Sequence, residues 1–138
     1  MTTTARMRDH DTVEAIRTAL PDVIAVYRFG STAAGVDRPD SDVDLALLAG
    51  APLPAVTRFD LQERIASVLQ RPVDLIDLRT ASPVMAMQVL ANGLLLLDAA
   101  PERRGEFEDR MFSAYARLNE ERRGILERVA AEGSVYGG

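Results

Sequence analysis

The sequence predicts an α/β (α+β) domain in which helices flank a small mixed β-sheet and a long helix follows at the C-terminal end. Short runs rich in Val, Ile and Leu alternate with stretches whose apolar residues recur at helical spacing, a pattern typical of such domains. Gly and Pro separate these segments, so each element has a stop signal before the next begins. Because the chain has 138 residues and no linker-like stretch, we expect a single domain over 1–138.

The first third of the chain predicts a helix and then two strands joined by a loop. Apolar residues keep helical spacing over 11–20 until Pro21 ends the helix. The segment before it holds the only histidine, His10, and we expect a flexible tail or a helix cap there. A β-branched and aromatic run at 22–30 predicts a buried strand, small polar residues then predict a loop, and 42–50 predicts the second strand.

The middle of the chain predicts a helix, a short strand and another helix. Residues 55–70 keep helical spacing and should pack on the sheet, and 71–78 reads as a short β-branched strand. Ser82 is a good N-cap and Pro83 suits the first helical position, so they predict the start of a helix that an Asn-Gly pair then closes.

The last third of the chain is dominated by one long predicted helix over 101–132. Before it, four consecutive leucines predict either a short buried strand or the start of the next connection. The apolar stripe of the helix is interrupted by Glu121 and Arg122, and Gly124 lies inside it. We expect its N-terminal half to dock on the domain core, at about 11–98, and the remainder to be either solvated or a partner-binding helix.

Composition narrows the chemistry that this chain can perform. It contains no cysteine, no lysine and one histidine. Disulfides, thiolate zinc sites, cysteine nucleophiles, Walker-type phosphate loops and lysine Schiff bases are therefore excluded, and Ser-His-Asp or multi-histidine metal sites are disfavoured. If the chain is an enzyme, its ionisable chemistry must come from carboxylates, Arg and Tyr, with a metal ion as the expected electrophile.

Charge and hydropathy limit the expected surroundings and partners. The net charge of −5 argues against an extended nucleic-acid footprint, because affinity for a polyanion comes largely from clustered basic charge. No stretch reaches the roughly 20 apolar residues needed to cross a bilayer, and the first residues lack the apolar run of a secretory signal. We therefore expect a cytoplasmic protein without a membrane or direct nucleic-acid partner.

Two features of the segment "FGSTAAGVDRPDSDVDLALL" predict a site for a metal ion and a phosphate. Asp42 and Asp44 alternate in a strand and so project from the same face, where their charges repel unless a cation lies beside them. Mg²⁺ commonly binds one or two carboxylates together with phosphate oxygens. Gly30 and Ser31, at the end of the preceding strand, offer close backbone approach, N–H groups and a hydroxyl to an anion.

Gly30, Ser31, ten further residues and then Asp42-Val43-Asp44 resemble the signature of the DNA polymerase β-like nucleotidyltransferase superfamily. The small size resembles its minimal nucleotidyltransferase (MNT) branch, the antitoxins paired with HEPN-domain toxins. The resemblance extends over about 11–97 and implies the nucleotidyltransferase fold. The long C-terminal helix is less diagnostic.

The superfamily uses a third carboxylate on a later strand. Asp74 and Asp77 are the candidates, and their odd separation puts them on opposite faces of a strand, so only one can join the first pair. The resemblance favours Asp74, whereas Asp77 suits a strand end or turn. An ordinary surface acid on an edge strand remains the alternative for Asp74.

The resemblance implies transfer of AMP from ATP to a tyrosine hydroxyl of a partner HEPN ribonuclease toxin, which silences it. Asp42 and Asp44 would hold one or two Mg²⁺ ions, Gly30 and Ser31 would seat the β- and γ-phosphates, and Asp74 would position a second metal and deprotonate the acceptor. Two alternatives stay open. The chain could neutralise its partner by contact alone, or it could modify a small-molecule hydroxyl such as that of an aminoglycoside.

Overall fold

The computed structural model describes residues 2–30 and 42–136, with side-chain surroundings for 9–30 and 42–132. The elements are, in chain order, α1 (Thr2–Ala19), β1 (Ala25–Phe29), β2 (Val43–Leu48), α3 (Ala55–Leu69), β3 (Val73–Asp77), α4 (Pro83–Asn92), β4 (Leu94–Asp98) and α5 (Pro101–Tyr136). This alternation of helices and strands, with a long last helix, confirms the predicted fold class.

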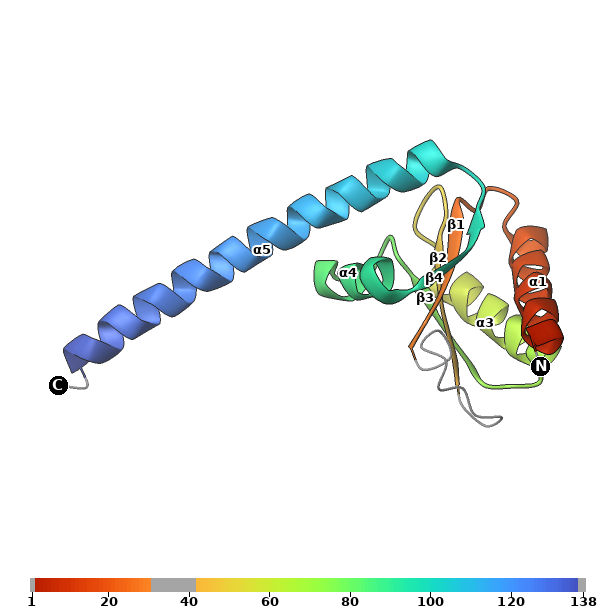
Figure 1. Ribbon diagram of the computed structural model, residues 1–138, viewed down its shortest axis with the longest axis horizontal. Helices are drawn as coiled ribbons and strands as arrows, with labels where there is room; N and C mark the ends of the chain where they lie inside the picture. The colour runs from red at the N-terminus through yellow and green to blue at the C-terminus, as the bar shows by residue number, and fades with distance from the viewer. Residues whose placement is uncertain (1, 31–41, 137–138) are drawn as a thin grey trace.

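The strands form one mixed four-stranded sheet in the order β3-β2-β1-β4. Strand β1 lies between β2 and β4 and is antiparallel to both, whereas β2 and β3 are parallel. Parallel neighbours need a crossover, and α3 provides it between β2 and β3. Helices α1 and α3 cover one face of the sheet, and α4 with the beginning of α5 covers the other (Figure 1).

Strand β2 is buried on both faces, which explains why its sequence is a nearly continuous apolar run. Leu45 and Leu47 belong to the core cluster under α1 and α3. Ala46 and Leu48 belong to the cluster under α4 and α5. Asp44 lies on this second face, at the beginning of the strand, where the apolar cover ends and its side chain remains partly exposed.

Side chains of α3 form hydrogen bonds with the backbone of β3, which is an edge strand of the sheet. The Leu75 N–H donates to Gln62 Oε1 at 3.0 Å, and Arg58 Nη1 donates to the Leu75 carbonyl oxygen at 3.0 Å. Arg58 Nη1 also donates to Gln62 Oε1 at 3.4 Å, so the two side chains support each other. The crossover helix thus satisfies backbone groups that a neighbouring strand would otherwise bind.

The predicted start and end signals of α4 are both present. The Ser82 hydroxyl accepts a hydrogen bond from the Met85 N–H at 3.2 Å, and Pro83 occupies the first helical turn, where its missing N–H is not needed. Gly93 closes the helix and donates its N–H to the Val89 carbonyl at 2.7 Å. The helix therefore covers the predicted residues.

The structure corrects two local expectations. Helix α1 begins at Thr2, so His10 lies within the helix and not in a flexible tail or at a cap. Residues 2–19 contain no Gly or Pro to stop the helix, and the ion pair between Asp9 Oδ1 and Arg28 Nη1, 3.0 Å apart, ties the extension to β1. The leucine run forms a strand, β4, but at the sheet edge, with Leu94 and Leu95 exposed, so it is not a buried strand.

The N-terminal part of α5 docks on the domain, as expected. Phe107 is buried in the cluster under α4. Arg104 forms an ion pair with Asp98 through Nε and Oδ1 at 2.9 Å, and a second one with Glu108. The Tyr27 hydroxyl donates to Glu108 Oε1 at 3.3 Å, and burial, followed by the Glu108 charge, raises the pKa of Tyr27. Strands β1 and β4 thereby anchor the helix.

The rest of α5 runs away from the sheet in one continuous helix (Figure 1). The helix has 36 residues and ends at Tyr136, four residues beyond the predicted end at 132. Across the described residues, every helix is too short or too polar to cross a membrane.

Candidate functional site

The register of the parallel pair places two of the predicted acids side by side. Asp44 of β2 and Asp74 of β3 are Cα partners, so their side chains leave the same face of adjacent strands. Neighbouring strands lie about 4.8 Å apart, which brings the two carboxylates within reach of one cation. Asp42 is the residue just before β2 and is exposed. The structure therefore brings Asp44 and Asp74 together, with Asp42 at the adjacent strand end.

These carboxylates influence one another electrostatically. Burial raises the pKa of Asp44 above its ordinary value, and the negative charges of Asp74 and Asp42 raise it further. Removing water from a carboxylate and placing like charges beside it both favour the protonated form. The charged form of Asp44 is thus held in an unfavourable place that a cation would make favourable.

The burial of Asp44 and the repulsion from its neighbouring acids predict that the metal-free protein is more stable when Asp44 carries no charge. Because the folded-state pKa of Asp44 is raised, the folded chain binds the proton more tightly than the unfolded chain, and ionisation of Asp44 destabilises the fold at neutral pH. We expect D44N in EDTA to melt at a higher temperature than wild type at pH 7. The difference should shrink as the pH falls and the native carboxyl becomes protonated. Thermal melts between pH 7 and pH 4 measure it, with D60N, an exposed acid on α3, as the control. A wild type that melts above D44N at pH 7 would contradict the assignment.

Gly30 is fixed by its contact with Asp44. It follows β1 directly and has a φ of +75°, a conformation that L side chains rarely adopt. A Cβ at this position would lie 2.2 Å from Asp44 Oδ2 and 3.1 Å from Asp44 Cγ. No side chain fits there while the carboxylate keeps its place. The sequence suggested that Gly30 lets the backbone come close to a phosphate. Among the described residues, the group that comes close to Gly30 is the Asp44 carboxylate.

The second phosphate-binding candidate, Ser31, lies outside the described residues. Sequence reasoning missed the contact between Gly30 and Asp44, because no local pattern shows which residue of a neighbouring strand will face a turn. The register supplies that link: Phe29, the residue before Gly30, is the Cα partner of Asp44.

Asp77 is engaged elsewhere and does not join the acids. It is buried, and its Oδ2 accepts from the Leu53 N–H at 2.8 Å while Oδ1 accepts from the Arg79 N–H at 2.9 Å. Both bonds fix backbone in the turns that follow β2 and β3, which is the strand-end role expected from the sequence. Its register partner is Leu47, on the face opposite to Asp44 and Asp74.

The donor set suits a hard cation that also binds its substrate. Within 2–30 and 42–136, no three His, Asp or Glu side chains are grouped closely enough to form a metal cage by themselves. The Asp44 and Asp74 pair, with Asp42 beside it, instead offers a few carboxylate oxygens on one side of an open site. Mg²⁺ is commonly held in this way, by one or two carboxylates plus phosphate oxygens and water.

The chain matches the family model of polymerase beta nucleotidyltransferases over residues 11–102. It is 32% identical over 126 residues to the protein adenylyltransferase MntA of Shewanella oneidensis, and the alignment covers 91% of this chain and 90% of that protein.

Solved structures agree with this match. A crystal structure of a toxin-antitoxin with AMP-PNP is similar at a TM-score of 0.79 and 33% identity, covering 88% of this chain and 98% of that one. A structure of the tri-AMPylated Shewanella oneidensis HEPN toxin in complex with MNT antitoxin is similar at a TM-score of 0.75 and 31% identity, covering 90% and 97%. With its mixed sheet and its paired acids on β2 and β3, the chain belongs to the polymerase beta nucleotidyltransferase family.

Proposed function

We propose that this chain is an antitoxin that transfers AMP from ATP to a tyrosine hydroxyl of a partner HEPN ribonuclease toxin and so neutralises it. The observation that carries the proposal is the in-register pair Asp44 and Asp74, packed against Gly30, in a chain 32% identical to a protein adenylyltransferase over nearly its whole length. The similar structures with AMP-PNP and with an AMPylated HEPN toxin support the donor and the acceptor. We infer a cytoplasmic location, where ATP is supplied.

In the proposed reaction the tyrosine oxygen attacks the α-phosphorus of ATP. A bond forms between that oxygen and phosphorus, the bond from phosphorus to the oxygen bridging the α- and β-phosphates breaks, and pyrophosphate leaves with the electron pair. The tyrosine proton goes to a carboxylate oxygen of Asp74. A base is needed because a tyrosine hydroxyl, with a pKa of about 10, is almost wholly protonated at neutral pH. Asp74 is exposed, so an acceptor carried by another protein can reach it.

Asp42 and Asp44 would hold Mg²⁺, with Asp74 contributing to a second ion. When bound, Mg²⁺ supplies positive charge beside the attacking and leaving oxygens, where negative charge develops. Gly30 and Ser31 would seat the β- and γ-phosphates. The contribution of Gly30 is steric: it leaves room for the Asp44 carboxylate at the end of β1.

The geometry argues against an antitoxin that acts by contact alone. Burial, and after it the charges of Asp74 and Asp42, raise the pKa of Asp44, so keeping this carboxylate charged lowers stability in the absence of a cation. An antitoxin that acted by contact alone would gain nothing from holding these repelling carboxylates together. A small-molecule acceptor is disfavoured because the AMP groups in the similar complex are carried by a protein, the HEPN toxin.

The test is an assay with labelled ATP and Mg²⁺, with and without the protein encoded by the neighbouring gene. We expect the label to appear on a tyrosine of that partner and to be absent from it when the D42A/D44A variant is used. Label on an aminoglycoside would support the small-molecule alternative. Neutralisation of the toxin by D42A/D44A would support the contact alternative and overturn the proposal.

A further inference from the structure

The C-terminal half of α5, with Arg117 just before it, carries charged side chains for which the described part of the chain provides no ion-pair partner. Residues 119–132 are exposed except for the half-buried Gly124. Arg117, Glu121, Arg128 and Glu132 follow one another at spacings that bring them to one side of the helix. In the described part of the chain none of these four forms an ion pair. Together with Gly124 and Ile125 at its centre, this side of the helix forms the 117–132 face.

The charges on the 117–132 face are ordered so that two copies of this face, running in opposite directions, place opposite charges next to each other. From the N-terminal end the signs run positive, negative, positive, negative, at Arg117, Glu121, Arg128 and Glu132. The four positions are symmetric about the point between Gly124 and Ile125. A second copy running in the opposite direction therefore sets Glu121 opposite Arg128 and Arg117 opposite Glu132, each twice. A copy running in the same direction would set like charges opposite one another.

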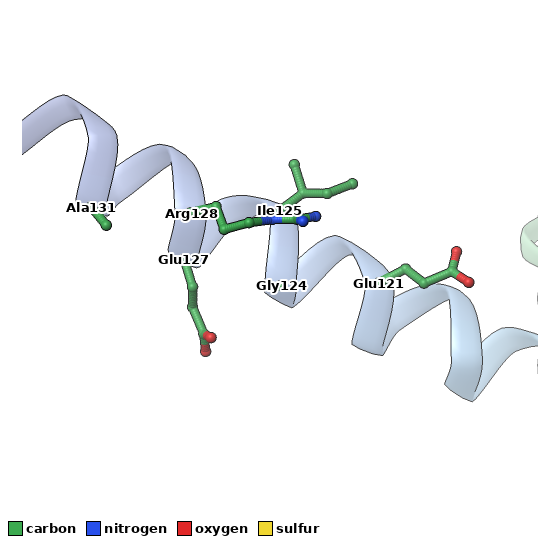
Figure 2. Close-up of a pocket in the computed structure, with 6 residues that line it drawn as sticks. All are labelled: Glu121, Gly124, Ile125, Glu127, Arg128 and Ala131. Carbon is green, nitrogen blue, oxygen red and sulfur yellow. The ribbon is translucent and has the colours of Figure 1, made fainter.

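The middle of the face is shaped for close approach. The small residues Gly124 and Ala131 line an open surface depression together with Glu121, Ile125, Glu127 and Arg128, and the side chains of Ile125 and Glu127 project to its two sides (Figure 2). A Cβ on Gly124 would meet nothing within 4 Å, so the fold of the single chain does not require glycine there. Glycine inside a helix costs about 1 kcal/mol relative to alanine. Contact with a second helix would explain the glycine at 124, because a glycine on each helix at the point of contact lets the two helix axes come closer together.

We propose that α5 pairs with α5 of a second copy of this chain, antiparallel, about a two-fold axis between Gly124 and Ile125. Ile125, 51% exposed, packs on its symmetry mate across the axis, and the paired charges close both ends of the contact. The pairing uses the part of the helix beyond Met111, which among the described residues is the last member of α5 in the hydrophobic cluster under α4. It goes beyond the proposed transferase function and does not depend on it.

Charge reversal with a matched control tests the interface. Sedimentation velocity at low salt should show wild type in a concentration-dependent equilibrium between 15.1 kDa chains and dimers. R128E replaces two attractive pairs by two repulsive ones and should raise the dimer dissociation constant about tenfold or more. R123E makes the same charge change on the opposite side of the helix and should leave the constant unchanged. The double variant E121R/R128E restores both pairs and should return it to near the wild-type value.

Single cysteines test the direction, because the chain has none of its own. In the antiparallel dimer I125C lies beside its symmetry mate and should form a disulfide-linked dimer under mild oxidation. E132C lies far from its mate and should give no disulfide-linked dimer, whereas in a parallel, in-register pair both cysteines would cross-link. A chain that remains monomeric at hundreds of micromolar, equal effects of R128E and R123E, or cross-linking of E132C would each overturn the proposal. It would also be overturned if R128E weakened only binding to the toxin, since the face would then belong to that partner.

Discussion

We expect the D44N variant to transfer AMP about 10²- to 10³-fold more slowly than wild type, the range seen when a group that stabilises developing charge is removed. Asparagine keeps the size of the side chain and its place on β2 beside Asp74 and Gly30, but it lacks the negative charge that holds a cation. The loss should persist at saturating ATP, because it concerns the transition state and not only binding. Initial rates of label transfer to the toxin measure it.

The control for D44N is D60N, which removes an exposed carboxylate from α3, on the other side of the sheet. This variant should retain the wild-type rate. A D44N rate within tenfold of wild type would contradict the role assigned to Asp44. Because D44N is also expected to melt higher than wild type without metal, unfolding would not explain a low rate.

We expect G30A to be both less stable and at least about 10²-fold less active. Alanine at a φ of +75° costs roughly 1–2 kcal/mol, and its methyl group would lie 2.2 Å from Asp44 Oδ2. The carboxylate must move to relieve this contact, and a displacement of about 1 Å at a reacting centre can cost about 10²-fold in rate. Thermal melts and label-transfer rates on the same preparation measure the two effects.

The control for G30A is G105A, in the docked part of α5. A Cβ there meets nothing within 4 Å, and alanine is the better helix former, so this variant should keep the activity and gain up to about 1 kcal/mol of stability. If G30A had the wild-type rate, the contact between Gly30 and Asp44 would not position the carboxylate.

Much of the candidate site could be predicted because strand alternation is a local property. The odd separation of Asp74 and Asp77 already shows that only one of them can face Asp44. Which one does so depends on the parallel register of β2 and β3, which is a tertiary property. The buried hydrogen bonds of Asp77 to the N–H groups of Leu53 and Arg79 likewise join segments that no short pattern connects.

The errors about the fold have the same physical origin. Helix α1 begins before Asp9, whose ion pair with Arg28 joins residues 19 apart in the sequence and so has no local signal. The leucines of β4 suggested burial, yet Leu94 and Leu95 are exposed because the strand lies at the sheet edge beside β1. Hydropathy indicates that a segment can be buried, but the topology decides whether anything covers it.

The side-chain bonds of Gln62 and Arg58 to Leu75 have a consequence for the folded protein outside any complex. An exposed edge strand has unpaired N–H and C=O groups to which a strand of another chain can bind, and repeated addition of strands leads to fibrils. Here an amide and a guanidinium already occupy the N–H and C=O groups of Leu75 that a foreign strand would need. At Leu75 the β3 edge of the sheet is thereby closed to strand addition by the same helix that makes the crossover.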